Sequence, residues 1–111
     1  MGVPTEQKAN NSTDVNKLPF SPVQRHITLE DIRELQREIA KRNTTTAVVI
    51  SAGTNRECRI YAAEIRKSLD SLGYPVDPHI YDEQGNGPDK RFHVGGVWTT
   101  TFIRVYPIYQ Y

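Results

Sequence analysis

The feature that most constrains the fold is a short apolar run, residues 47–50, that leads within a few positions into a helix-start signal. The run is mostly β-branched and does not alternate with polar residues, which is typical of a strand buried on both faces. Thr54 and Glu57 then have the spacing of a capping box, so a helix is expected to begin there. The sequence therefore predicts a central strand that passes directly into a helix.

Helical periodicity is found on both sides of this strand. Before it, apolar residues recur at spacings of three and four behind Thr28, an N-cap residue whose capping partner is Asp31. This first helix is expected to end near residues 42–43. After the strand, the second helix keeps the same periodicity, and Gly73 followed by Pro75 marks its end. The apolar stripes are Leu29, Ile32, Leu35 and Ile39 in the first helix and Cys58, Tyr61, Ala62, Ile65, Leu69 and Leu72 in the second.

Three further strands are expected after the second helix. Residues 76–81 form a short or edge strand, because Pro78 removes a main-chain donor. Residues 91–94 and 97–106 flank Gly95-Gly96, a pair that suits a tight hairpin turn. The predicted fold class is α/β with the order α-β-α-β-β-β, in which two helices pack on a mixed sheet of about four strands. The spacing leaves open whether both helices cover one face of the sheet.

The N-terminal segment differs in composition from the rest of the chain. Residues 1–24 are polar, contain three prolines and bury too little apolar surface to offset their ordering entropy. We expect a flexible, disordered tail over residues 1–24 and a single domain over residues 25–111, because a second core would leave each half too small. The alternative is a segment that folds on a partner through Leu18, Pro19 and Phe20.

Charge and cysteine content narrow the classes of function. The formal net charge is +1 at pH 7, which provides no general field for a polyanion and disfavours nucleic acid as a partner. The single cysteine, Cys58, has no internal disulfide partner, and this favours a reducing compartment. No apolar run approaches the roughly 20 residues that cross a bilayer, and no signal-peptide pattern is found. A cytoplasmic location without membrane contact is expected.

The predicted strand-to-helix loop, residues 51–59, is the first candidate site. Small polar residues after a buried strand leave main-chain amides free near the positive end of a helix dipole, where anions bind. The expected ligand is a small anion or a nucleotide-like molecule. Neither the Walker spacing nor the dinucleotide-binding glycine motif is present, so the alternative is a plain turn with a helix cap. The expected ligand-binding residues are Ser51, Gly53, Thr54, Asn55, Arg56 and Arg59.

The C-terminal strand is the second candidate site. It concentrates aromatic side chains beside arginines, a combination that anchors protein partners, stacks nucleobases or simply fills a core. A partner protein could also add a strand at an exposed sheet edge, and a homodimer through the last strand is a further alternative. The expected partner-binding residues are Trp98, Phe102, Arg104 and Tyr106.

Catalytic and metal-binding chemistry have less support in the sequence. The three histidines lack zinc-ligand spacing, so no metal and no cofactor are expected. Cys58 lies on an apolar stripe without a partnering base, which favours a buried structural cysteine. A small hydrolase or transferase that uses Glu57 with Asp82 or Glu83 stays an alternative. The sequence favours a non-catalytic binding module, with an anionic ligand as the first hypothesis and a protein partner as the second.

Overall fold

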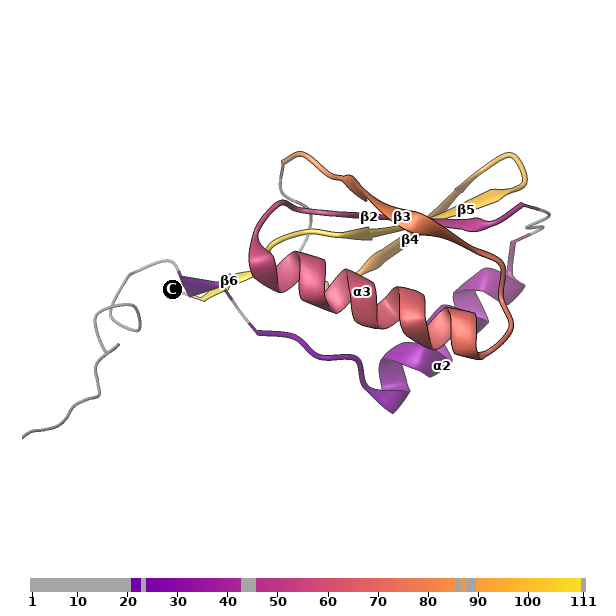
Figure 1. The fold of residues 1–111 in the computed structure, drawn as a ribbon, viewed down its shortest axis with the longest axis horizontal. Coiled ribbons are helices and arrows are strands. Elements are labelled where there is room, and N and C mark those ends of the chain that lie inside the picture. The colour runs from indigo at the N-terminus through magenta and orange to yellow at the C-terminus, as the bar shows by residue number, and fades with distance from the viewer. Residues whose placement is uncertain (1–20, 23, 43–45, 86, 88–89, 111) are drawn as a thin grey trace, which may run out of the picture.

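The computed structural model describes residues 21–22, 24–42, 46–85, 87 and 90–110 (Figure 1). This part of the chain forms two helices and a four-stranded mixed sheet in the order α-β-α-β-β-β, which confirms the predicted fold class. Most of the predicted tail, residues 1–20 and 23, lies outside the described residues. Two residues of the predicted tail form a strand. This strand, β1 (Ser21–Pro22), pairs antiparallel with β6 (Tyr109–Gln110) near the other end of the chain.

The sheet places the predicted central strand in its interior. The strand order is β3-β2-β5-β4, in which β3 (Val76–Asp82) and β5 (Thr100–Val105) flank β2 (Val48–Ala52) in parallel. The remaining strand, β4 (His93–Val97), pairs antiparallel with β5 and forms one edge. The strand that contains Pro78 forms the other edge, as predicted.

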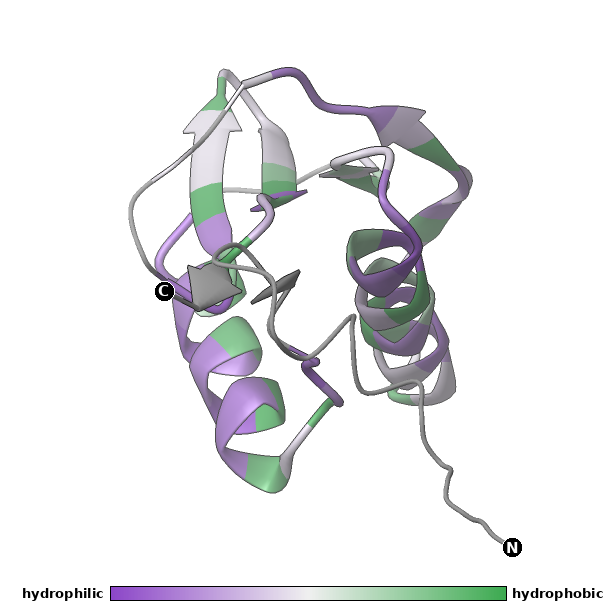
Figure 2. Cartoon of the chain, turned by 90° about the vertical axis from the view of Figure 1, so that its left-hand side faces the viewer, coloured by the Kyte–Doolittle hydropathy of each residue, from purple (hydrophilic) through white to green (hydrophobic). Residues whose placement is uncertain are grey.

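Both helices, α2 (Leu29–Ala40) and α3 (Arg56–Ser71), cover the same face of the sheet (Figure 1). Figure 2, turned by 90°, shows the strands on one side and both helices on the other. No described helix or strand forms a layer on the opposite face. Burial therefore alternates along β2, and the prediction that this strand is buried on both faces is wrong for the described part of the chain. The buried apolar core consists of Leu35, Ile39, Val48, Ile50, Ala52, Cys58, Tyr61, Ala62, Ile65, Leu69, Ile103 and Val105.

Helix α2 begins with the predicted capping box. The Thr28 hydroxyl accepts the N–H of Asp31, and the Asp31 carboxylate accepts the N–H of Thr28, each at 3.1 Å. Leu29 departs from the predicted apolar stripe, because it is the first residue of the helix and 62% of its surface is exposed. The buried positions of this helix are instead Asp31, Leu35 and Ile39, which are spaced one turn apart.

The start of α3 differs from the predicted capping box of Thr54 and Glu57. The helix is capped by Asn55, whose side-chain oxygen accepts the N–H of Cys58 at 2.8 Å. The Glu57 carboxylate is buried and bonded to Arg25, 32 positions earlier in the chain, so it is not available to a cap. The end of the helix is as predicted, with Gly73 in the left-handed region at φ 90°.

The last hairpin turns at a different place from the predicted Gly95-Gly96. Strand β4 runs through both glycines, and Trp98 and Thr99 form the turn between the paired residues Val97 and Thr100. Trp98 has φ 59°, a left-handed conformation that costs a non-glycine residue about 1–2 kcal/mol. Because glycine is the usual residue at such a position, the sequence pattern points to the wrong pair.

A buried ion pair connects the segment before α2 to the first turn of α3. Arg25 donates from Nη2 to Glu57 Oε1 at 2.6 Å and from Nε to Oε2 at 2.8 Å, and the two side chains are only 1% and 3% exposed. The same guanidinium donates to the carbonyl oxygens of Arg91 and Tyr106, both at 2.9 Å. One side chain therefore joins α3 to the segments on either side of the last hairpin.

Candidate functional site

The predicted strand-to-helix loop lines a cavity of about 290 Å³ at the carboxyl ends of the parallel strands. The walls come from the loop after β2, the loop after β3 and the segment after β5. Crevices at this end of α/β sheets are common ligand sites. Half of the predicted ligand residues contribute to the cavity and the other half do not. We call this cavity the carboxyl-end cavity. Its lining residues are Gly53, Thr54, Asn55, Glu83, Gln84, Gly85 and Pro107.

The two arginines predicted to bind an anion do not line the carboxyl-end cavity. Arg59 turns toward β3, where it donates to the carbonyl of Ile80 at 3.0 Å and forms an ion pair with Asp82. Arg56 is exposed. The described lining residues therefore include a carboxylate, Glu83, and no basic side chain.

One of the residues that line the carboxyl-end cavity carries an unpaired hydrogen-bond donor. The side-chain Nδ2 of Asn55 is buried and has no hydrogen-bond partner among the described residues, while the oxygen of the same amide caps α3. A buried polar group without a partner costs about 1–3 kcal/mol. An acceptor oxygen brought within hydrogen-bond distance of this donor would remove that cost, and the nearby helix N-terminus would favour a negative charge on it.

The face of the sheet opposite the helices carries a larger groove of about 440 Å³. Ser51 pairs with Tyr81 on one side and with Arg104 on the other, and Val49 pairs with Phe102, so these five side chains share one face. We call the side of the sheet that carries these five side chains and the groove the open face. Its apolar part is formed by valine and aromatic rings, and its polar part lies toward the carboxyl ends of the strands.

The polar part of the open face is internally paired. The Ser51 hydroxyl donates to the Glu83 carboxylate at 2.7 Å, and Arg104 Nε lies 3.5 Å from the same carboxylate. The Arg104 guanidinium also lies 5.6 Å from the centre of the Phe102 ring. Ser51, predicted as a ligand residue of the loop, thus belongs to the open face.

The four predicted partner-binding residues occupy three different places. Phe102 and Arg104 lie on the open face. Trp98 lies at the hairpin turn, where 97% of its surface is exposed. Tyr106 is half-buried beyond the end of β5, and its ring contacts the ring of His93 with 5.3 Å between centres. The structure therefore brings two of the four together.

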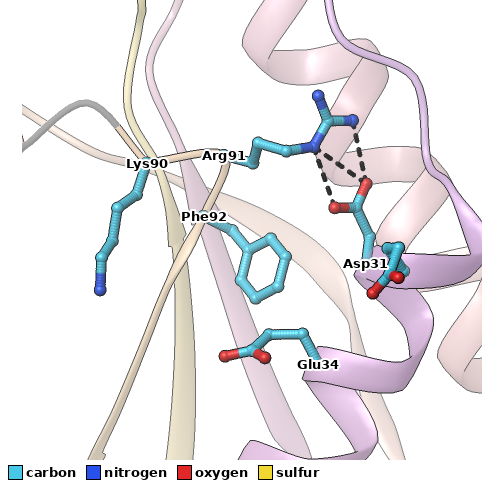
Figure 3. Close-up of a pocket in the computed structure, with 6 residues that line it drawn as sticks. Asp31, Glu34, Lys90, Arg91 and Phe92 are labelled. Atoms are coloured by element: carbon cyan, nitrogen blue, oxygen red, sulfur yellow. Dashed lines mark hydrogen bonds and ion pairs between the residues drawn. The ribbon is translucent and has the colours of Figure 1, made fainter.

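A third cavity, of about 290 Å³, lies between α2 and the segment that leads into β4 (Figure 3). Arg91 donates from Nε and Nη2 to the Asp31 carboxylate at 2.9 and 3.0 Å, and the Tyr61 hydroxyl donates to it at 2.9 Å. Burial alone would raise the pKa of Asp31, but the bonds from Arg91, Tyr61 and Thr28 outweigh it and lower that pKa below its usual value. Lys90 points away from this pair in Figure 3. The buried charge of this cavity is satisfied within the protein.

Two residues considered for catalysis are withdrawn from solvent. Both oxygens of the Glu57 carboxylate are bonded to Arg25, so this carboxylate is not free to act as a base. Cys58 is buried, as predicted. Desolvation raises the pKa of its thiol, and the opposing effect of the Arg25 charge is smaller. The raised pKa keeps the thiol protonated. Among the described residues, no group of three or more histidine, cysteine, aspartate or glutamate side chains is arranged to hold a metal ion.

No family model, curated protein or solved structure matches the chain. Within the part of the chain that the structure describes, neither helix has the length and apolar character of a membrane span.

The strain at the hairpin turn leads to a prediction about stability. Replacing Trp98 by glycine is expected to stabilise the fold by about 1 kcal/mol, because glycine adopts a positive φ without a steric cost. Urea unfolding measures the change. Trp98→Ala is the matched control, since it removes the same exposed ring but keeps the strained backbone. A glycine variant no more stable than the alanine variant would show that the turn is unstrained.

Proposed function

We propose that this chain is a non-catalytic protein-binding module whose partner docks on the open face, with Trp98 as a separate contact at the hairpin turn. The observation that carries the proposal is one face of a largely parallel sheet over which no described helix or strand lies. Parallel sheets almost always have both faces covered by other elements. Here three of the four strands are parallel, yet the helices cover one face only. A partner would complete the burial.

The side chains available for contact support a protein partner. Aromatic residues and arginine dominate the energetics of protein interfaces, and the open face combines Phe102, Tyr81 and Arg104 around a groove. Trp98 adds a large exposed ring held in a costly backbone conformation. Strain of this kind persists mainly where a site uses it.

The charges on the open face favour protein over nucleic acid. The cation of this face, Arg104, is paired with the Glu83 carboxylate, and Asp82 adds a second carboxylate to the same groove. Phosphate backbones require several free cations in a row. The groove provides instead an apolar floor with a mixed polar end, which is the usual character of a protein interface.

Site-specific photocrosslinking tests this proposal. A benzophenone amino acid placed at Phe102 is expected to crosslink a partner protein in an extract of the source cells, whereas the same group at Arg33, exposed on α2, is not. Adding Arg104→Glu should lower the yield at least about tenfold, because it replaces the cation beside Glu83 with a second negative charge on the docking face. Equal yields from both positions, or none from Phe102, would rule the open face out.

We also propose a second function, binding of a small anion in the carboxyl-end cavity, because Asn55 Nδ2 is a buried donor without a described partner. Since Glu83 lines the cavity and no described basic side chain does, the ligand is a single oxyanion held weakly and not a polyphosphate.

Titration with inorganic phosphate should shift the amide resonances of Gly53 to Glu57 at millimolar concentration. Asn55→Asp keeps the capping oxygen but removes the donor, so it should abolish the shifts. Arg33→Ala, on the exposed side of α2 and away from the cavity, is the control and should leave the shifts in place. Unchanged resonances in the native chain would contradict the anion hypothesis.

A further inference from the structure

We infer that the partner docks on the open face as an amphipathic helix, which supplies a third layer that the described part of the chain does not form. This inference rests on the proposed function and specifies the form of the partner. Three forms are compatible with docking at a sheet: an added strand, a second copy of the chain, and a helix. The edges and the dimensions of the sheet distinguish them.

The edge formed by β3 is poorly suited to an added strand. Pro78 has no N–H, and the N–H of His79 is bonded to the Asp77 carboxylate at 3.0 Å. Arg59 occupies the carbonyl of Ile80 at 3.0 Å on this same edge strand. Natural proteins block sheet edges with prolines and charged side chains of this kind. Three main-chain groups in the middle of this strand are therefore already used or missing, which disfavours an added strand at this edge.

The edge formed by β4 carries an arginine as well. Arg42 donates from Nη2 to the carbonyl of Val94 at 3.0 Å, and Glu38 holds the same guanidinium at 3.0 Å. A Cβ built on Gly96 would lie 3.4 Å from the Arg42 side chain, which shows that this side chain lies along the strand. An added strand would have to displace it and break the bonds that fix it. Docking on the face requires no such step.

The size of the open face argues against a second copy. The open face spans three strands about 4.8 Å apart, with five residues of about 3.3 Å each, and so measures about 14 Å by 17 Å. A second copy would have to contact surface well beyond this face to reach the roughly 800 Å² of accessible area that each partner contributes to a standard interface. A three-turn helix is about 10 Å wide and 16 Å long, so the face accommodates one helix.

The chemistry of the open face defines the helix. Val49 and Phe102 lie side by side in the sheet. A helix that covers them needs an apolar stripe of residues spaced three and four apart. The end that holds Ser51, Glu83 and Arg104 requires polar or charged residues on the helix. Val49 also belongs to the apolar run whose sequence is typical of burial on both faces, and a docked helix would provide that burial.

The test uses the full chain with the benzophenone group at Phe102 or, separately, at Tyr81. The crosslinked partner segment is sequenced, and each of its residues is replaced by aspartate in turn. We expect the crosslink yield to fall at least about tenfold at positions three and four apart, the period of a helix face, and by less than about twofold elsewhere. Arg33 on α2 again carries the control group.

The other outcomes separate this inference from the proposed function. Losses at alternate residues would identify an extended strand, and a crosslink to a second copy of the chain would identify a dimer; either result overturns the helix while leaving the open face as the docking site. No crosslink from either position would overturn the proposed function, and the inference with it.

Discussion

Replacing Arg25 by alanine is expected to lower the free energy of unfolding by about 3–5 kcal/mol, because Glu57 would be left as a buried charge without a partner. The variant also loses the bonds to the carbonyl oxygens of Arg91 and Tyr106. Small domains are stable by only about 5–15 kcal/mol, so the change removes a large share of the total. Urea unfolding followed by circular dichroism measures it.

Two controls make this prediction specific to the buried pair. Arg37→Ala breaks an ion pair with Glu34 on the exposed surface and should cost less than about 1 kcal/mol. The double replacement Arg25→Met with Glu57→Leu removes both charges together and should recover part of the stability, because neither charge is then left unpaired, although the carbonyl oxygens of Arg91 and Tyr106 still lack their donor. If the double variant were as unstable as Arg25→Ala, the lost hydrogen bonds to the carbonyl oxygens of Arg91 and Tyr106, and not the orphaned carboxylate, would be the cause.

The second large effect concerns two neighbouring residues of β5 that face opposite sides of the sheet. Ile103 is completely buried under the helices, so Ile103→Ala should cost about 2–5 kcal/mol through lost contacts and a residual cavity. Phe102→Ala removes a larger side chain but one that is only half-buried on the open face, so it should cost less, about 1–2 kcal/mol. Parallel urea titrations of the two variants provide the comparison.

The comparison between Ile103 and Phe102 tests the central claim about the fold. If only one face of the sheet is covered, the smaller side chain has the larger effect on stability. Equal costs at the two positions would mean that a part of the chain outside the described residues covers the open face in solution. The open face would then be unavailable to a partner.

The order of elements was predictable because its signals are local. The Thr28–Asp31 capping box, the stop at Gly73 and the apolar stripe of α3 each depend on residues within one or two turns of one another. The pair Thr54 and Glu57 has the same spacing as a capping box but does not form one. Its carboxylate is bonded to Arg25, and a contact between residues so far apart in sequence leaves no periodic signal.

The candidate sites were predicted only in part, because the sequence pattern indicates local geometry and not contacts between distant segments. The loop from Gly53 to Asn55 lines a cavity because it follows a parallel strand, which the sequence pattern indicates. Arg59 was assigned to that loop by proximity in sequence, yet the turn of the helix directs it to the edge of β3. The turn at Trp98 was missed because a tryptophan occupies a conformation that sequence rules reserve for glycine.

The position of β5 in the sheet has a consequence for synthesis on the ribosome. This strand comes last among the four, but it lies between β2 and β4 and contributes Ile103 and Val105 to the core. Until it has left the exit tunnel, β2 lacks one of its two neighbours and β4 has none. Nascent chains at that stage expose unpaired strands, so they are the species that chaperones would protect from aggregation.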